Sequence, residues 1–229
     1  NTVNPAYGDD GTEANALPFL RSFFAQHGIE TTEQEVFPGR HNLLARLPGR
    51  GPQRLVLEAH TDTVSIKGMT IPPFEPAIRN GRIYGRGSVD DKAGLAAMMQ
   101  AVASIHAEGI TPPCEVLLAA VVDEEFSYRG VVRLCEGLRA DAAIVAEPTE
   151  MRVVIASKGV LRLRLHTRGL AAHSAKPHLG NNAISHMARL VLALEAEHAS
   201  LASKTHPLLG PATGSIGVIR GGVQVNQVP

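Results

Sequence analysis

Acidic residues and one histidine occur in four short motifs that follow predicted strands or precede a predicted helix. The motifs read His60-Thr-Asp62-Thr-Val, Gly85-Arg-Gly-Ser-Val-Asp90-Asp-Lys92, Asp123-Glu124-Glu125 and Glu147-Pro-Thr. The carboxyl edge of an α/β sheet is the usual place for a functional site, and parallel strands all end at that edge. We therefore expect the ligand-type side chains of the four motifs to converge there, namely those of His60, Asp90, Glu125 and Glu147.

Convergence would bring about five carboxylates into one pocket, those of Asp62, Asp90, Glu124, Glu125 and Glu147. Like charges at short range raise one another's pKa, so these groups cannot all stay ionised without a cation. Lys92 and a neutral His60 cannot compensate for that charge, whereas two divalent metal ions would. A set of histidine nitrogen and carboxylate oxygen atoms suits Zn²⁺, with Co²⁺ or Mn²⁺ as possible substitutes.

Each motif taken alone also has an ordinary structural explanation. A His-x-Asp pair at a strand end is often only a hydrogen-bonded pair. Acidic residues at a helix start complement the helix dipole, and Glu147-Pro-Thr could be a simple turn. The four motifs together favour a metal site. The chain has no Gly-x-Ser-x-Gly or His-Glu-x-x-His motif, and Asp90 stands where a dinucleotide loop needs its third glycine.

Hydrophobic periodicity indicates the elements that must position these motifs. Helices are predicted at residues 12–27, 92–108 and 131–138, and strands at residues 42–47, 54–59, 115–122 and 142–146. This alternation predicts an α/β fold with a mostly parallel or mixed sheet. From about residue 158 the pattern changes to a strand at 160–166, a helix at 181–198 and a strand at 215–219. We therefore expect a first domain over residues 1–157 and an α+β domain over residues 158–229, incomplete at its C-terminus.

Composition excludes several classes of protein. The 229 residues carry 22 basic and 22 acidic side chains, so a nucleic-acid or anionic membrane partner recognised through bulk charge is not expected. No apolar run approaches the ~20 residues needed to cross a bilayer, and no signal pattern follows Asn1. Two cysteines are too few for a disulfide scaffold, so a cytoplasmic location is the default expectation.

The four motifs, in this order and spacing, resemble the dinuclear-zinc aminoacylase and carboxypeptidase family. That family includes acetylornithine deacetylase, succinyl-diaminopimelate desuccinylase, aminoacylase-1 and glutamate carboxypeptidase. The resemblance continues through Gly169-Leu-Ala-Ala-His173-Ser-Ala-Lys-Pro177 and Gly217-Val-Ile-Arg220-Gly-Gly222, and covers essentially the whole chain. It implies a zinc-peptidase-like catalytic domain with a mixed sheet and helices on both faces, plus a smaller α+β dimerisation (lid) domain.

The resemblance also implies a set of metal ligands. His60 and Glu147 would hold one zinc ion, Glu125 would hold the other, and Asp90 would bridge both. Asp62 would orient the His60 ring. The remaining histidine ligand of the second zinc is expected beyond residue 229, in a longer protein.

Catalytic and substrate roles follow from the same resemblance. Glu124 would be the general base that acts on a metal-bridging water. His173 would cross the interface of a homodimer and stabilise the oxyanion in the partner's site. Asn226 and Arg220 would contact the carboxylate end of the substrate.

These roles predict a metal-dependent hydrolase that cleaves the amide bond of an N-acyl amino acid or a small peptide. The Glu147-Pro-Thr motif and the general similarity of the sequence favour the acetylornithine deacetylase and desuccinylase branch. Two alternatives stay open at this point. One is a dipeptidase or carboxypeptidase of the same family, and the other is a non-catalytic binding protein that keeps the same fold. The intact Glu124 beside Glu125 argues against the second alternative.

Overall fold

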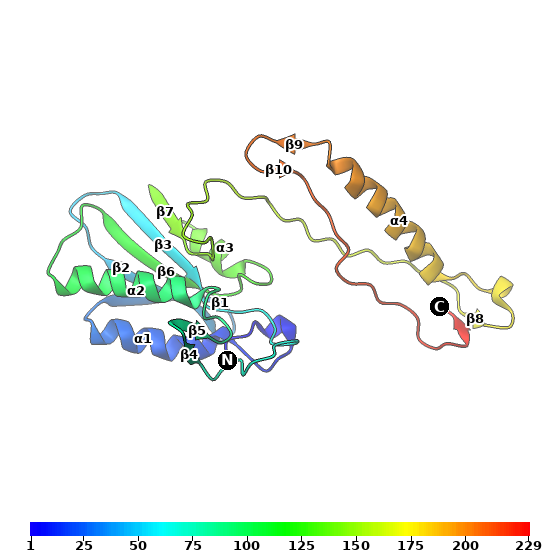
Figure 1. Cartoon of the computed structure of the whole chain (residues 1–229), viewed down its shortest axis with the longest axis horizontal. Coiled ribbons are helices and arrows are strands. Elements are labelled where there is room, and N and C mark those ends of the chain that lie inside the picture. The colour runs from blue at the N-terminus through cyan, green and yellow to red at the C-terminus, as the bar shows by residue number, and fades with distance from the viewer. The chain divides into compact units, whose positions relative to one another are not determined.

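The computed structural model describes residues 1–229 and divides them into two compact units (Figure 1). The first unit is Asn1–Met151 and the second is Arg152–Pro229. Assigning these parts to a catalytic domain and a dimerisation domain, with a boundary between residues 157 and 158, stays a prediction.

The first unit is built on a five-stranded sheet with the order β1-β2-β6-β3-β7. Strand β3 runs parallel to β6 and β7, whereas β2 runs antiparallel to β1 and β6. The expected α/β fold with a mixed sheet is therefore confirmed. The strands are β1 (Glu30–Phe37), β2 (Arg40–Leu47), β3 (Arg54–His60), β6 (Glu115–Val121) and β7 (Ala142–Val145).

Helices cover both faces of this sheet. Helices α1 (Leu17–Gln26) and α2 (Lys92–Ala107) pack on one face, and α3 (Arg129–Cys135) contributes Leu134 to the apolar cluster on the other (Figure 1). The apolar strand β6 explains why both faces need covering. Its alternate residues enter the two clusters, with Leu118 on the α1–α2 side and Leu117 on the α3 side. A continuous apolar run is typical of such a strand, buried on both faces.

The parallel register of β3, β6 and β7 fixes where the site must lie. His60, the last residue of β3, is level with Val121, the last residue of β6. Val145, the last residue of β7, is level with Glu58 of β3. All three strands therefore end at one edge of the sheet, and the acidic motifs continue from that edge.

Strand β1 and a small hairpin of the first unit were not predicted from the sequence. Strand β1 is an edge strand with the polar sequence Glu-Thr-Thr-Glu-Gln-Glu-Val-Phe, so it shows no apolar alternation. The expected loop over residues 65–86 contains a small hairpin of β4 (Ala77–Arg79) and β5 (Arg82–Tyr84). The two strands are joined by Asn80-Gly81, both at positive φ, which is the sequence signal of a tight hairpin turn.

The second unit contains one long helix, α4 (Ala183–Leu201), close to the expected position. Asn182 caps its N-terminus by accepting a 2.9 Å hydrogen bond from the backbone N–H of Ser185. Two-residue strands pair as β8 (Ala172–His173) with β11 (Gln227–Val228), and as β9 (Thr205–His206) with β10 (Gly210–Pro211). Neither α4 nor any other helix has the length and hydropathy needed to span a bilayer.

The strands predicted at residues 160–166 and 215–219 were wrong, because both segments lie outside helices and strands. A strand needs a neighbouring backbone to bond with, and neither segment has a ladder partner in this unit. Their apolar side chains stay in solvent, as Leu161 shows at 81% exposure. The alternation of apolar and polar residues in these segments therefore resembles a strand, although no strand ladder forms there.

Candidate metal centre

His60 lies at the carboxyl end of β3 with only 2% of its surface exposed. Its Nδ1 is 3.0 Å from the backbone oxygen of Asp62, an atom that can only accept, so Nδ1 carries a proton. The other ring nitrogen, Nε2, lies 2.9 Å from Oδ1 of Asp90 and 4.0 Å from Oε2 of Glu124. The ring is therefore held from behind and presents Nε2 to the acidic side chains.

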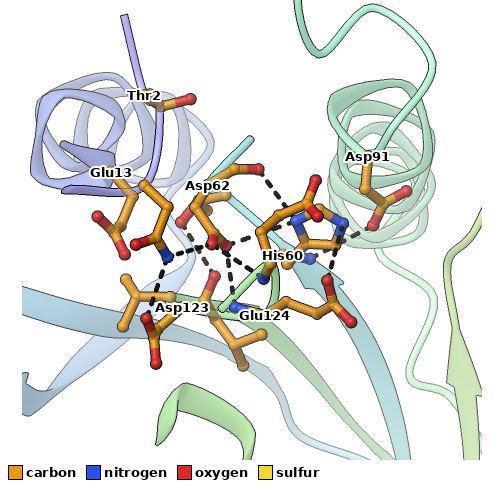
Figure 2. Close-up of polar contacts among 12 residues, drawn as sticks. Thr2, Glu13, His60, Asp62, Asp91, Asp123 and Glu124 are labelled. Atoms are coloured by element: carbon orange, nitrogen blue, oxygen red, sulfur yellow. Dashed lines mark hydrogen bonds and ion pairs between the residues drawn. The ribbon is translucent and has the colours of Figure 1, made fainter. Parts of the chain in front are cut away.

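Asp62 is fully buried behind the histidine and receives several hydrogen bonds (Figure 2). Its two carboxylate oxygens accept the backbone N–H groups of Glu124 and Glu125, each at 3.1 Å. Burial alone would raise the pKa of Asp62, but hydrogen bonds from His60 and Asn4 outweigh burial and lower that pKa. Asp62 is thus an ionised anchor shared by the histidine and by the turn after β6.

The structure brings the four sequence motifs together at the sheet edge. Ligand atoms of His60, Asp90 and Glu147 all lie within 4.8 Å of one another, and so do those of His60, Glu124 and Glu125. Asp90 comes from the loop before α2, Glu147 follows β7, and the other two acids follow β6. The expected convergence is therefore present, while the individual roles of these residues stay predictions.

The cluster holds more negative charge than its surroundings neutralise. Burial raises the pKa values of Glu124, Glu125 and Glu147, and neighbouring carboxylates raise them further. Burial disfavours a charged His60, but Asp62, Glu124 and Asp91 outweigh that effect and raise the pKa of His60 to about 10. A site that draws a proton onto a buried histidine so strongly is one that favours a cation.

A divalent metal fits the donors that are present. The Oε1 atom of Glu125 is buried and has no hydrogen-bond partner, which leaves a carboxylate oxygen available as a ligand. One imidazole nitrogen with several carboxylate oxygens is a donor set typical of Zn²⁺ and of related divalent ions. The site therefore has the negative charge, a carboxylate oxygen without a hydrogen-bond partner and the ligand types that a metal centre requires.

Sequence reasoning gave no site role to three buried groups around the histidine. Asp91 accepts a 3.3 Å hydrogen bond from the backbone N–H of His60, and burial raises the pKa of Asp91 to about 7. Burial likewise raises the pKa of Glu58 to about 7. Glu58 had a signal in the sequence, because an acidic residue two positions before His60 in an apolar strand must share its face. Asn4 had no such signal.

Three predicted site residues belong to the second unit. His173 in β8 is opposite Gln227 in β11, and its Nδ1 accepts a 3.1 Å hydrogen bond from the backbone N–H of Ala175. The backbone oxygen of Asn226 accepts a 3.0 Å hydrogen bond from Ser174, so Asn226 lies close to His173. Arg220 is exposed and lies outside helices and strands. The predicted roles of these three residues stay predictions.

Comparison with known proteins identifies the family. The sequence profile of peptidase family M20/M25/M40 matches residues 56–224, a range that includes all four acidic motifs. The chain belongs to this family. The family resemblance noted in the sequence is therefore confirmed.

Two relatives agree with this assignment, and one solved structure shares the fold. The chain is 34% identical over 232 residues to an acetylornithine deacetylase of Photorhabdus laumondii, covering 96% of this chain and 58% of that protein. It is 30% identical over 246 residues to a probable succinyl-diaminopimelate desuccinylase of Staphylococcus epidermidis, covering 95% and 60%. An M20 metallo-carboxypeptidase of Sulfolobus solfataricus shares the fold, with a TM-score of 0.59, 18% identity and coverage of 81% and 45%. The M20 chain described here thus spans less than two thirds of the length of these proteins.

Replacing Asp62 with asparagine tests the anchor behind His60. The amide keeps the size of the side chain, but its NH₂ group replaces one of the two oxygens that accept from the backbone N–H groups of Glu124 and Glu125, so one of these bonds is lost. We expect zinc affinity to fall about 10–100-fold, the usual effect of losing a group that orients a ligand. Competition titration against a chelator measures that affinity. Unchanged zinc affinity in a folded variant would mean that Asp62 does not orient the site.

Proposed function

We propose that this M20 chain forms the metal-binding part of a hydrolase that cleaves the amide bond of an N-acyl amino acid or a small peptide. The observation that carries the proposal is the cluster at the sheet edge, where His60 belongs to two groups of ligand atoms that together include four carboxylates. Within each group the ligand atoms lie within 4.8 Å of one another. Membership in family M20/M25/M40 supports a peptidase or amide hydrolase. The names of the deacetylase and desuccinylase relatives favour an N-acyl amino acid as the substrate.

Two zinc ions are the metals we propose for this site. His60, Asp90 and Glu147 would hold one ion, and Glu125 would hold the other with Asp90 shared between them. The unpaired Oε1 of Glu125 supports its assignment as a ligand. When bound, the metals would polarise the scissile carbonyl and stabilise the negative charge that develops on its oxygen.

Glu124 is the residue that we assign to proton transfer. Its backbone N–H is tied to Asp62, while its side chain is 31% exposed and ends 4.0 Å from the Nε2 atom of His60. The carboxylate can therefore reach both the cluster and an incoming substrate. Burial raises the pKa of Glu124 above its usual value, which suits a group that must hold a proton briefly.

The proton balance of the reaction then follows. Glu124 takes a proton from the attacking water while the oxygen of that water forms a bond to the amide carbon. The bond between carbon and nitrogen breaks, and Glu124 returns the proton to the leaving amine. The carboxylate is restored at the end, so Glu124 acts as base and then as acid in one cycle.

A substrate panel tests this function in the full-length protein. N-acetyl, N-succinyl and dipeptide substrates should be compared with zinc or cobalt present. We expect metal-dependent release of a free amine, fastest for an N-acyl amino acid, and its loss after chelation. Cleavage of dipeptides alone would favour the peptidase alternative. Metal binding without turnover of any substrate would favour a binding protein on the same fold.

We further propose that the second unit forms a homodimer and that His173 completes the partner's site. Exposed apolar side chains on α4 support an interface, with Ile184 46% and Leu192 66% exposed. A histidine donor at a developing oxyanion is a common source of transition-state stabilisation.

Mixed dimers give a direct check of the shared site. A His173→Ala protein and a Glu124→Gln protein should each be nearly inactive alone. After subunit exchange, activity should partly return, because one site of each mixed dimer then has both groups. Mixing under conditions that block exchange provides the control. No recovery after verified exchange would contradict a site built from two subunits.

A further inference from the structure

The segment before the first helix lies directly against the loop that carries Asp62. Val3 forms a parallel bridge with Thr63, and the backbone N–H of Asn4 donates to the oxygen of Thr63 at 2.9 Å. The backbone N–H of Thr63 donates in turn to the oxygen of Thr2 at 3.1 Å. Val3 and Asn4 are fully buried. This pairing fixes the backbone of Asn4 beside the site.

The side chain of Asn4 joins two buried carboxylates. Its Nδ2 atom donates to Oδ2 of Asp62 at 2.7 Å and to Oδ1 of Asp123 at 3.0 Å. Its Oδ1 atom accepts from the backbone N–H of Ala6 at 3.0 Å, so the orientation of the amide is determined. An NH₂ group has two donors, and here each is directed to a different carboxylate. A neutral side chain thus holds two anions together in the interior.

The two carboxylates in turn hold the backbone of the turn after β6. Asp62 accepts hydrogen bonds from the backbone N–H groups of Glu124, labelled in Figure 2, and of Glu125. Asp123 accepts hydrogen bonds from the hydroxyl of Ser127 and from the N–H of Arg129, the latter at 3.3 Å. The turn that presents the proposed base and a proposed metal ligand is therefore bound at both ends. Asn4 is the side chain that connects the two ends.

No other neighbour can do the same for both acids. Arg40 contacts Asp123 at 3.4 Å, but its main partner is Glu13. Without the Asn4 amide, Asp62 and Asp123 would each lose a buried donor, and no shared donor would offset the repulsion between their negative charges. They would then separate or draw in water, and the turn between them would move with them.

We propose that Asn4 is a positioning residue that sets the Glu124–Glu125 turn and the His60 ring through Asp62 and Asp123. This inference rests on the proposed function, since the positioned groups are the proposed base and metal ligands. Two substitutions distinguish the effect of the Asn4 hydrogen-bond donors from the effect of the space that its side chain fills. Asn4→Asp keeps the shape but replaces the donors with a third carboxylate, and Asn4→Ala removes the group without adding charge.

Hydrogen exchange in the metal-free full-length protein is the first readout. In both variants the amides of Glu124 and Glu125 should exchange at least about tenfold faster than in the wild type, because their acceptor is displaced. Amides in the middle of α2 should keep their rates. A Val102→Ala variant, in which a fully buried residue of α2 is truncated, provides a control for general destabilisation.

Metal and kinetic measurements form the second readout. Both Asn4 variants should bind cobalt about 10–100-fold more weakly and show an altered cobalt absorption spectrum. At saturating metal, kcat should fall while KM changes little. Val102→Ala should keep the cobalt spectrum and kcat even when its thermal stability falls as much.

The outcomes separate this inference from the proposed function. If the wild type hydrolyses no amide, the proposed function fails, while faster exchange at Glu124 and Glu125 still supports positioning by Asn4. Wild-type exchange rates at these amides in a folded Asn4→Asp variant would overturn the inference. So would equal effects of Val102→Ala on the exchange rates and the cobalt spectrum, because Asn4 would then be only a structural residue.

Discussion

Glu124→Gln is expected to lower kcat by about 10²–10⁴-fold while metal content stays at the wild-type level. Glutamine keeps the size of the side chain and the backbone hydrogen bond to Asp62, but it cannot accept a proton from water. Steady-state kinetics together with metal analysis of the same sample check this expectation. The loss should appear in kcat rather than in KM, since proton transfer occurs only in the reaction itself.

A second Glu→Gln substitution provides the control. Glu136 is an exposed residue that pairs only with Arg133 at 2.8 Å, so Glu136→Gln should retain wild-type activity. Retention of most activity by Glu124→Gln would show that the base has been assigned to the wrong residue.

Asp90→Ala is expected to remove both metal ions and with them all activity. The Asp90 carboxylate lies 2.9 Å from the Nε2 atom of His60 and is the group that we assign to both metals. Without the Asp90 carboxylate, each ion loses one ligand, and the two ions lose the ligand that they share. Isothermal titration with zinc measures the number of ions bound and their affinity.

Glu108→Ala is the matched control for this variant. Glu108 lies at the C-terminal end of α2, whereas Asp90 precedes the N-terminal end of the same helix. The control should bind zinc like the wild type. Two intact zinc sites in Asp90→Ala would contradict the assignment of Asp90 as the bridging ligand.

The sheet and most of the site could be predicted because short stretches of sequence show where the strands lie and which acidic residues follow them. The apolar run of β6 predicted a strand buried on both faces, and the parallel direction of β3 and β6 followed from the helix between them. Once these strands were placed, acidic residues at their carboxyl ends had to meet. The convergence of His60 with Glu124 and Glu125 therefore needed only strand positions and chain direction.

Other parts depend on contacts that no local pattern encodes. Asn4 acquires its position from a single bridge between Val3 and Thr63, about 60 residues apart in the sequence. The edge strand β1 is polar because none of its side chains is buried on either face, so its sequence resembles that of a loop. The segment at residues 160–166 shows the reverse case, since its alternation resembles a strand although it pairs with no strand of a sheet.

The position of bound zinc decides whether the carboxyl edge of the sheet is the metal centre. Crystals of the zinc-loaded protein should give anomalous difference peaks at the zinc absorption edge beside the carboxyl ends of β3, β6 and β7. We predict a peak about 2.0–2.2 Å from Nε2 of His60 and from carboxylate oxygens of Asp90 and Glu147. A zinc-loaded protein with no peak at His60, and with its zinc on other histidines such as His173 and His178, would rule out a metal centre at this edge of the sheet.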